Sequence, residues 1–213
     1  MTRVKICGNT NAEDIAAAID FGADYLGLIF TESPRRIDPA LAKRWIPEFP
    51  YFGGFVGVFS GQSVPEIGSI AREVGLRTVQ LHGDEPPEDC QSLAAQGFHV
   101  IKTLRIRDRA SLKDAQRYGV EAFLLDTFVE GKIGGTGLTF DWSIFSDEGF
   151  DRTRMGIAGG LTPENVAQAV RKARPWLVDT VSGVETSPGK KDFGKMRAFI
   201  EAVRKENAGY AVE

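Results

Sequence analysis

The sequence is poor in the residues from which disulfide and metal frameworks are made. Among 213 residues there are two cysteines and two histidines, and Cys7 and Cys90 do not stand in a Cys-x-x-Cys pattern. Disulfide scaffolds and structural zinc sites need more such residues at closer spacing. We therefore expect no disulfide, no metal and no cofactor, so that each thiol must serve either packing or chemistry.

Long apolar runs and an excess of charge of one sign are also missing. No stretch approaches the roughly 20 apolar residues of a membrane-spanning helix, and the amino terminus lacks the apolar run of a secretory signal. The formal net charge of −3 provides no general attraction to nucleic acid or anionic membranes. We expect a cytoplasmic protein with neither partner, and the sequence leaves monomer and homodimer open.

Short apolar runs alternate with helical patterns along the whole chain. Strands are expected at 3–7, 24–30, 52–59, 77–82, 99–104, 121–126, within 154–160 and at 176–182. Short apolar strands of this kind are typical of a parallel sheet that is covered on both faces. Strict alternation fits a doubly wound sheet or a closed barrel, and eight units in about 200 residues favour the barrel. Residues 1–213 are thus predicted to form a single-domain (β/α)8 TIM barrel of the α/β class.

Several strands are followed by local signals for the start of a helix. Capping boxes, in which serine or threonine precedes glutamate by three residues, occur at Thr10–Glu13 and Ser63–Glu66. Proline is favoured at the first helical position, which predicts helix starts at Asp38–Pro39 and Thr162–Pro163. Further helices are expected over about 86–97, over about 108–118, from near 141 and over about 192–205, with a frayed tail at 207–213.

Polar residues gather at the predicted carboxyl ends of the strands, where barrels of this class carry their active sites. Cys7 ends the first strand, Gln80 and His82 end the fourth, and Asp126 ends the sixth. Lys5 should share the inward face with Cys7 because strand side chains alternate, and Asp126 is a candidate partner for its charge. Gln80 and His82 share a face for the same reason, either to contact a ligand or to complete the barrel interior.

Asp126 follows four apolar residues in the run AFLLD. Partial desolvation raises the pKa of a carboxyl group and suits it to acid catalysis, although Asp126 alone could equally cap the next turn. The glycine-rich stretch behind it contains Gly135 and Thr136. That stretch is either a loop that closes over a ligand or an ordinary surface turn.

Two loops near the end of the chain predict a phosphate site. Gly159 and Gly160 allow close approach of the backbone, and the helix expected after them would direct free N–H groups at an anion. Ser182 and Gly183 add further donors in the loop after the eighth strand. A tight turn would explain the glycine pair alone, but barrels often build a phosphate site from these two loops together.

Arg35 and Arg36 follow Pro34 in the loop after the second strand. A guanidinium group pairs with a carboxylate through two parallel hydrogen bonds. One of the two arginines is expected to bind an acid group of the substrate, and the other to be solvated. Cys90 lies inside a predicted helix and is expected to be a packing residue.

The motifs KICG, SPR, QLHG, LLDT…GGTG, AGGLTPENV and SGVE…PGKKD follow one another between residues 3 and about 200. This ordered series resembles the phosphoribosylanthranilate isomerases of tryptophan biosynthesis. The resemblance implies a (β/α)8 enzyme that converts N-(5-phosphoribosyl)anthranilate to 1-(o-carboxyphenylamino)-1-deoxyribulose 5-phosphate, without cofactor or metal. In that Amadori rearrangement an aspartate protonates the ribose ring oxygen, which opens the ring to a Schiff base. A cysteine then removes the C2′ proton, and the enol-amine becomes the ketone.

The same resemblance assigns roles to individual residues. It maps the catalytic cysteine onto Cys7, the aspartate onto Asp126 and the arginine that holds the anthranilate carboxylate onto Arg35. With Arg35, the expected substrate-binding residues are Lys5, Gln80, His82, Gly135 and Thr136. The expected phosphate-binding residues are Gly159, Gly160, Ser182 and Gly183.

Two other functions compete with this one. The ribosyl isomerase of histidine biosynthesis, or a bifunctional enzyme, shares the barrel and the phosphate site but uses aspartates as both acid and base, so Cys7 argues against it. A non-catalytic barrel that senses a phosphosugar needs neither Cys7 nor Asp126.

Overall fold

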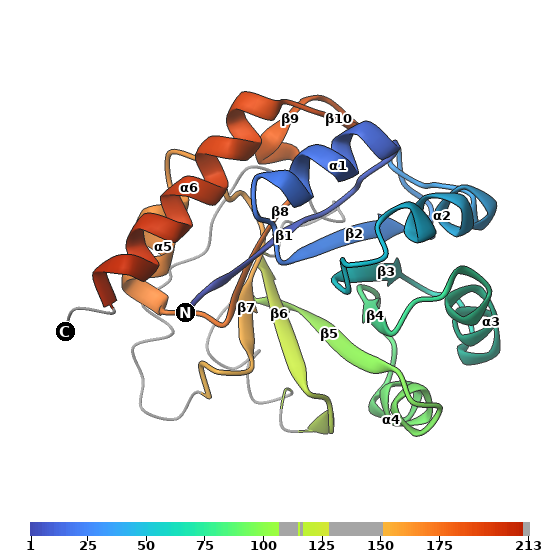
Figure 1. Ribbon diagram of the computed structural model, residues 1–213. Helices are drawn as coiled ribbons and strands as arrows, with labels where there is room; N and C mark the ends of the chain where they lie inside the picture. Colours follow the sequence, from blue (N-terminus) through green and yellow to red (C-terminus); the bar gives the residue numbers. More distant parts are fainter. Residues whose placement is uncertain (107–114, 116, 128–150, 211–213) are drawn as a thin grey trace.

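The computed structural model describes residues 1–106, 115, 117–127 and 151–210. Eight parallel strands close into a barrel in which each strand pairs with its neighbours in the sequence and β1 pairs with β8. The strands are β1 (Arg3–Ile6), β2 (Tyr25–Ile29), β3 (Phe55–Phe59), β4 (Thr78–Leu81), β5 (His99–Ile106), β6 (Ala122–Thr127), β7 (Met155–Ile157) and β8 (Leu177–Thr180). The predicted (β/α)8 barrel is confirmed, and each strand lies where the apolar runs placed it (Figure 1).

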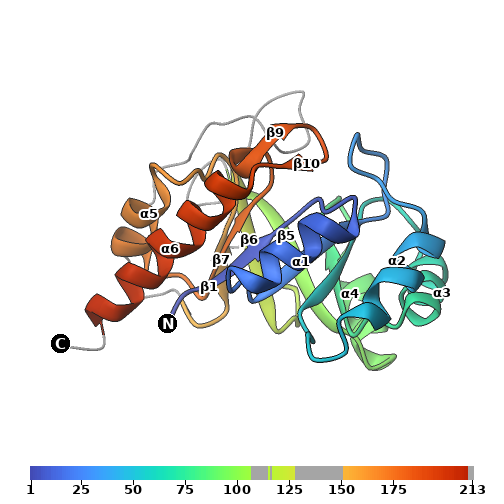
Figure 2. The ribbon, with the colours of Figure 1, turned by 45° about the horizontal axis from the view of Figure 1, so that its top comes forward.

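Helices surround the barrel on the outside, as the two ribbon views show (Figures 1 and 2). They are α1 (Ala12–Asp20), α2 (Pro39–Trp45), α3 (Val64–Val74), α4 (Pro87–Ala95), α5 (Val166–Ala173) and α6 (Phe193–Tyr210). The start at Asp38–Pro39 and the capping box of Ser63 and Glu66 are confirmed. The helix expected near residue 141 and most of the one over 108–118 lie outside the described residues.

Two helix starts differ from the prediction. Asn11 rather than Thr10 caps α1, because its side chain accepts a hydrogen bond from the backbone N–H of Asp14. The hydroxyl of Thr10 instead donates to the carbonyl of Gly189. After β7 the chain first makes a turn over 163–165, and α5 begins only at Val166.

The carboxyl-terminal segment also differs from the prediction. Helix α6 continues to Tyr210, so residues 207–210 are helical rather than frayed. The buried amide of Asn207 accepts from the backbone N–H of Thr2 and donates to its carbonyl, at 2.8 Å each. A hairpin of β9 (Glu185–Ser187) and β10 (Lys190–Lys191), which sequence patterns did not predict, precedes α6 (Figure 2).

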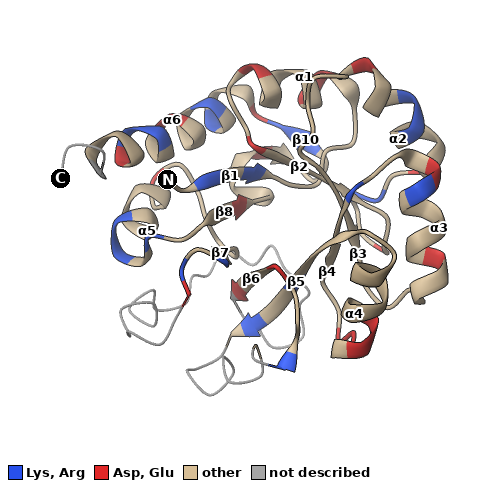
Figure 3. Cartoon of the chain, turned by 60° about the horizontal axis from the view of Figure 1, so that its bottom comes forward, with Lys and Arg blue, Asp and Glu red and all other residues tan. Residues whose placement is uncertain are grey.

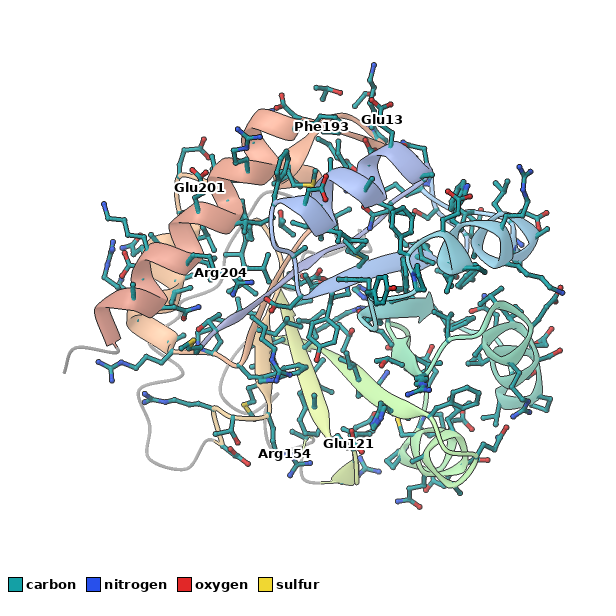
Figure 4. The ribbon with its side chains drawn as sticks, viewed as in Figure 1. Glu13, Glu121, Arg154, Phe193, Glu201 and Arg204 are labelled. Atoms are coloured by element: carbon teal, nitrogen blue, oxygen red, sulfur yellow. The ribbon has the colours of Figure 1, made fainter. Side chains whose placement is uncertain are left out.

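Apolar side chains form an outer layer between strands and helices and an inner layer inside the barrel. Charged positions of both signs lie on the outer helices α3 and α6 (Figure 3). Arg204 of α6 binds Asp24 at 2.8 Å, and Arg154 binds the carbonyl of Glu121 at 3.1 Å, so ion pairs and polar contacts tie neighbouring elements together (Figure 4). Among the described residues, no helix combines the length and apolarity that a membrane span requires.

Candidate active site

Two adjoining hollows open at the carboxyl ends of the strands. The first is lined by Cys7 and Arg35 together with apolar side chains from β2 and β3. The second is lined by Asp126 and by the loops that follow β7 and β8. His82, Asp179 and Val181 line both hollows, so the two are halves of one elongated site.

Cys7 lies directly after β1, where its backbone N–H donates to the carbonyl of Thr180 at 2.9 Å. Its side chain is buried against Ile29 and Val58. Gly27 of β2 leaves the room for the sulfur, because a Cβ atom at that position would overlap the Cys7 Sγ. Burial raises the pKa of the Cys7 thiol above its usual value, while the positive charge of neighbouring Lys5 opposes the rise.

Lys5 shares the inward face with Cys7, as alternation predicted, but its partner is not Asp126. Its Nζ donates to Asp179 of β8 at 3.0 Å, and both side chains are buried. The reason is barrel closure, since β1 pairs with β8 and the register sets Lys5 beside Asp179. Burial alone would lower the pKa of Lys5, but Asp179 and Cys7 outweigh it and raise that pKa, which keeps the group an ammonium.

Asp126 ends a chain of polar contacts that runs across three strands. Its Oδ2 lies 3.3 Å from Nε2 of His82, whose Nδ1 lies 3.2 Å from the amide nitrogen of Gln80. That amide also donates to the hydroxyl of Thr103 at 3.1 Å. An amide that donates to Nδ1 leaves the proton of a neutral imidazole on Nε2, facing Asp126. The predicted common face of Gln80 and His82 is confirmed.

Arg35 reaches into the first hollow, whereas Arg36 is exposed. Glu185 binds Arg35 with two prongs: Nε donates to Oε1 at 2.8 Å and Nη2 donates to Oε2 at 2.7 Å. Hydrogen bonding to Glu185 raises the pKa of Arg35. Burial alone would raise the pKa of Glu185, but the hydrogen bonds and charges of Arg35 and Lys191 outweigh it and lower that pKa.

The two loops of the predicted phosphate site both line the second hollow. Gly159 and Gly160 have φ of 83° and 65°, left-handed conformations that glycine adopts without strain. Ser182 and Gly183 begin a short 3₁₀ helix, η4 (Ser182–Val184), directly after β8. Because α5 begins later than predicted, the donors nearest this hollow come from these two turns and not from that helix.

The structure thus brings together nearly all of the residues that the sequence singled out for the site. Gly135 and Thr136 lie outside the described residues. Sequence reasoning missed Asp179, Glu185 and Lys191. Each is a charged side chain that is buried, and Asp179 carried a usable signal, because it interrupts the apolar run of its strand. Within the described part of the chain, no three His, Cys, Asp or Glu side chains are grouped to hold a metal ion.

Comparisons with known proteins show the family to which the chain is similar. Residues 4–202 match the model of the family described as N-(5′-phosphoribosyl)anthranilate (PRA) isomerase. An N-(5′-phosphoribosyl)anthranilate isomerase from Pelobacter propionicus is 45% identical over 205 residues, 96% of each chain. The enzyme of that name from Moorella thermoacetica is 45% identical over 209 residues, 96% of this chain and 91% of the relative.

Solved structures give the same result. The crystal structure of phosphoribosyl anthranilate isomerase from Thermotoga maritima superposes with a TM-score of 0.88 at 40% identity, covering 96% of this chain and 100% of that one. Another such isomerase structure, a complex with reduced 1-(o-carboxyphenylamino)-1-deoxyribulose 5-phosphate, has a TM-score of 0.85 at 39% identity, with the same coverage. The family model and these relatives each span nearly the whole chain, which therefore belongs to the N-(5′-phosphoribosyl)anthranilate isomerase family.

Proposed function

We propose that Cys7 is the general base and Asp126 the general acid of the Amadori rearrangement that defines this family. Protonated Asp126 gives its proton to the ribose ring oxygen of N-(5-phosphoribosyl)anthranilate, and the ring opens to a Schiff base. The Cys7 thiolate removes the C2′ proton, which leaves an enol-amine. The enol-amine then takes a proton at C1′ and loses the proton of its C2′ hydroxyl, which yields the ketone 1-(o-carboxyphenylamino)-1-deoxyribulose 5-phosphate; these two transfers balance the proton that Cys7 gained and the proton that Asp126 lost.

The observation that carries this proposal is the pair of adjoining hollows, with Cys7 in one and Asp126 in the other. The substrate has an anionic phosphate at one end, an aromatic acid at the other and the reacting sugar between them. The phosphate fits the turns at Gly159–Gly160 and Ser182–Gly183, which offer backbone N–H groups. The anthranilate ring fits the apolar wall of the first hollow, and its carboxylate fits the guanidinium there.

Buried polar neighbours hold both groups in place, and Lys5 also acts on the protonation of Cys7. Lys5 places a buried positive charge beside Cys7 and favours its thiolate. His82, held by Gln80, contacts Asp126 and fixes the direction in which the carboxyl group faces. Asp179 pairs with Lys5 and lines both hollows.

Turnover decides between this reaction and its nearest rival. The purified protein should consume N-(5-phosphoribosyl)anthranilate, which is followed by the change in its fluorescence. We expect no comparable turnover of the aminoaldose phosphate of histidine biosynthesis, because the barrel places a thiol where that chemistry uses a second carboxylate. Equal turnover of both substrates would make the protein bifunctional. Binding without turnover of either would make it a sensor.

Replacing Arg35 by alanine should raise KM by roughly tenfold or more and change kcat much less. A hydrogen bond to a charged group contributes about 1.5 to 3 kcal/mol, and about 1.4 kcal/mol corresponds to tenfold in affinity. Arg36→Ala is the matched control, because Arg36 is the exposed neighbour, and its KM should stay within a factor of two of wild type. Steady-state kinetics on both variants measure this. A larger effect at Arg36 would move the carboxylate site to that residue.

A further inference from the structure

Three buried or half-buried charges connect the first hollow to the β9–β10 hairpin. Glu185 begins β9 and pairs in register with Lys191 of β10. Strand β10 consists of two lysines and is therefore drawn in blue in Figure 3. The Nζ of Lys191 donates to Oε1 of Glu185 at 3.1 Å and to the carbonyl of Cys7 at 2.5 Å. One lysine thus contacts both the carboxylate that holds Arg35 and the backbone of Cys7.

The contacts of Arg35 leave one edge of its guanidinium for a ligand. Nε and Nη2 are occupied by Glu185, with a further contact from Nε to Oε2 at 3.1 Å. Among the described residues, Nη1 has no hydrogen-bond partner in the protein. Because the guanidinium is planar and Glu185 binds it through two parallel hydrogen bonds, its remaining edge can point in only one direction.

Packing the β9–β10 hairpin against the barrel does not require a buried cluster of three charged side chains. Burying charges is costly, and a buried ion pair is often no more stabilising than apolar side chains of the same volume. Here the Lys191 side chain is fully buried, and the Glu185 side chain is 4% exposed. Arg35 lines the hollow, and with Glu185 and Lys191 behind it the three side chains carry one net positive charge, whereas Arg35 and Glu185 alone would be neutral.

We propose that Glu185 is a positioning residue that aims Arg35 at the carboxylate of the substrate, and that Lys191 supplies the charge that keeps this wall attractive to an anion. This inference rests on the proposed role of Arg35. Neither Glu185 nor Lys191 lines either hollow, so in this proposal both act through Arg35. The hairpin is therefore a part of the carboxylate site, although it lies outside the barrel.

The test compares two stable ligands that differ only in that carboxylate. One is reduced 1-(o-carboxyphenylamino)-1-deoxyribulose 5-phosphate, and the other is the same compound without the carboxyl group. Their dissociation constants are measured by titration calorimetry, and the ratio of the two is the carboxylate selectivity. Glu185→Gln should lower this selectivity by about tenfold, because an amide cannot accept both guanidinium hydrogen bonds. Affinity for the ligand without the carboxylate should stay within about a factor of two.

Lys191→Met should lower the selectivity in the same direction, because the wall loses its net charge. Exposed neighbours provide matched controls: Lys190→Met on the same strand and Glu201→Gln on α6 (Figure 4) should leave both ligands unaffected. Circular dichroism establishes that each variant is folded. If Lys191→Met does not fold, Glu185→Gln alone decides the outcome, since it keeps the buried volume unchanged.

The double variant Arg35→Ala/Glu185→Gln separates positioning from bracing of the hairpin. We expect Arg35→Ala to abolish the selectivity and Glu185→Gln to have no further effect in that background. Equal weakening of both ligands by Glu185→Gln, or an unchanged or increased selectivity, would overturn the proposal while leaving Arg35 as the carboxylate site. Undiminished selectivity in Arg35→Ala would instead overturn the role of Arg35, and the positioning role with it.

Discussion

Replacing Cys7 by serine should lower kcat by roughly 10²-fold or more and leave KM nearly unchanged. One general base contributes about this much to a rate, and a serine hydroxyl does not ionise near neutral pH. Serine fits the space that Gly27 leaves beside β1, and substrate binding depends on the phosphate turns and Arg35 rather than on the thiol. Steady-state kcat and KM of the purified variant measure the effect.

The second cysteine provides the control for this variant. Cys90 is buried in α4 within the outer apolar layer, and burial raises its pKa to about 11. Cys90 lines neither hollow of the site, so its thiol is not placed to take a proton from the substrate. Cys90→Ser should therefore keep a kcat near that of wild type. A wild-type kcat in Cys7→Ser would return Cys7 to the role of a packing residue at the end of a strand.

The pH profile gives a second measure of Cys7. Catalysis needs a thiolate and a protonated carboxyl group, and carboxyl groups ordinarily titrate several pH units below thiols. Between the pKa of the carboxyl group and that of the thiol, each pH unit raises the fraction of thiolate tenfold and lowers the fraction of protonated acid tenfold. The two changes cancel, so kcat/KM should be constant over this range. Above the pKa of Cys7 the fraction of thiolate no longer increases while the fraction of protonated acid continues to decrease, so kcat/KM should fall. Because burial raises this pKa, the fall should begin above the usual thiol value, and Cys7→Ser should lose it.

Replacing Asp126 by asparagine should also lower kcat by roughly 10²-fold or more, with KM little changed. The amide has the same shape and can keep a contact with His82, but it has no proton to give to the ring oxygen. The pH profile should change its form as well. In this variant no loss of protonated acid offsets the gain of Cys7 thiolate as the pH rises. The residual kcat/KM should therefore rise about tenfold per pH unit up to the pKa of Cys7.

Asp38→Asn is the matched control for Asp126→Asn. Asp38 caps α2 on the outside of the barrel, and asparagine is an equally good helix cap, so rate and profile should match wild type. A plateau in Asp126→Asn like that of wild type would show that another group donates the proton. His82 would be the first candidate, because its Nε2 faces the same position.

Much of this protein is determined by short-range pattern in the sequence. Strand positions follow from apolar runs of four to eight residues, since a strand buried on both faces needs apolar side chains on each. Alternation then placed Lys5 with Cys7, and Gln80 with His82, on common faces, as the structure confirms. The capping box at Ser63 is also local, because both of its hydrogen bonds lie within one turn.

Helix ends were less predictable because neighbours in space compete for the same local groups. Thr10 had the spacing of a cap, yet Gly189 takes its hydroxyl, and Asn11 caps α1 instead. Asn207 and Gly209 are weak helix formers, yet Asn207 is held by the backbone of Thr2 at the other end of the chain. In each case a contact between distant segments decides the local structure.

Only the tertiary structure decided which charges are partners. Alternation states which side of a strand a residue faces, but the residue beside it depends on which strands are neighbours when the barrel closes. Closure sets β1 against β8, so Lys5 finds Asp179, 174 residues away, rather than Asp126. In the same way, folding of the β9–β10 hairpin brings Glu185 to Arg35, 150 residues away, and Lys191 to Cys7. Sequence pattern identified most of the chemical groups of the site, and the closed barrel arranged them because it alone joins the two ends of the chain.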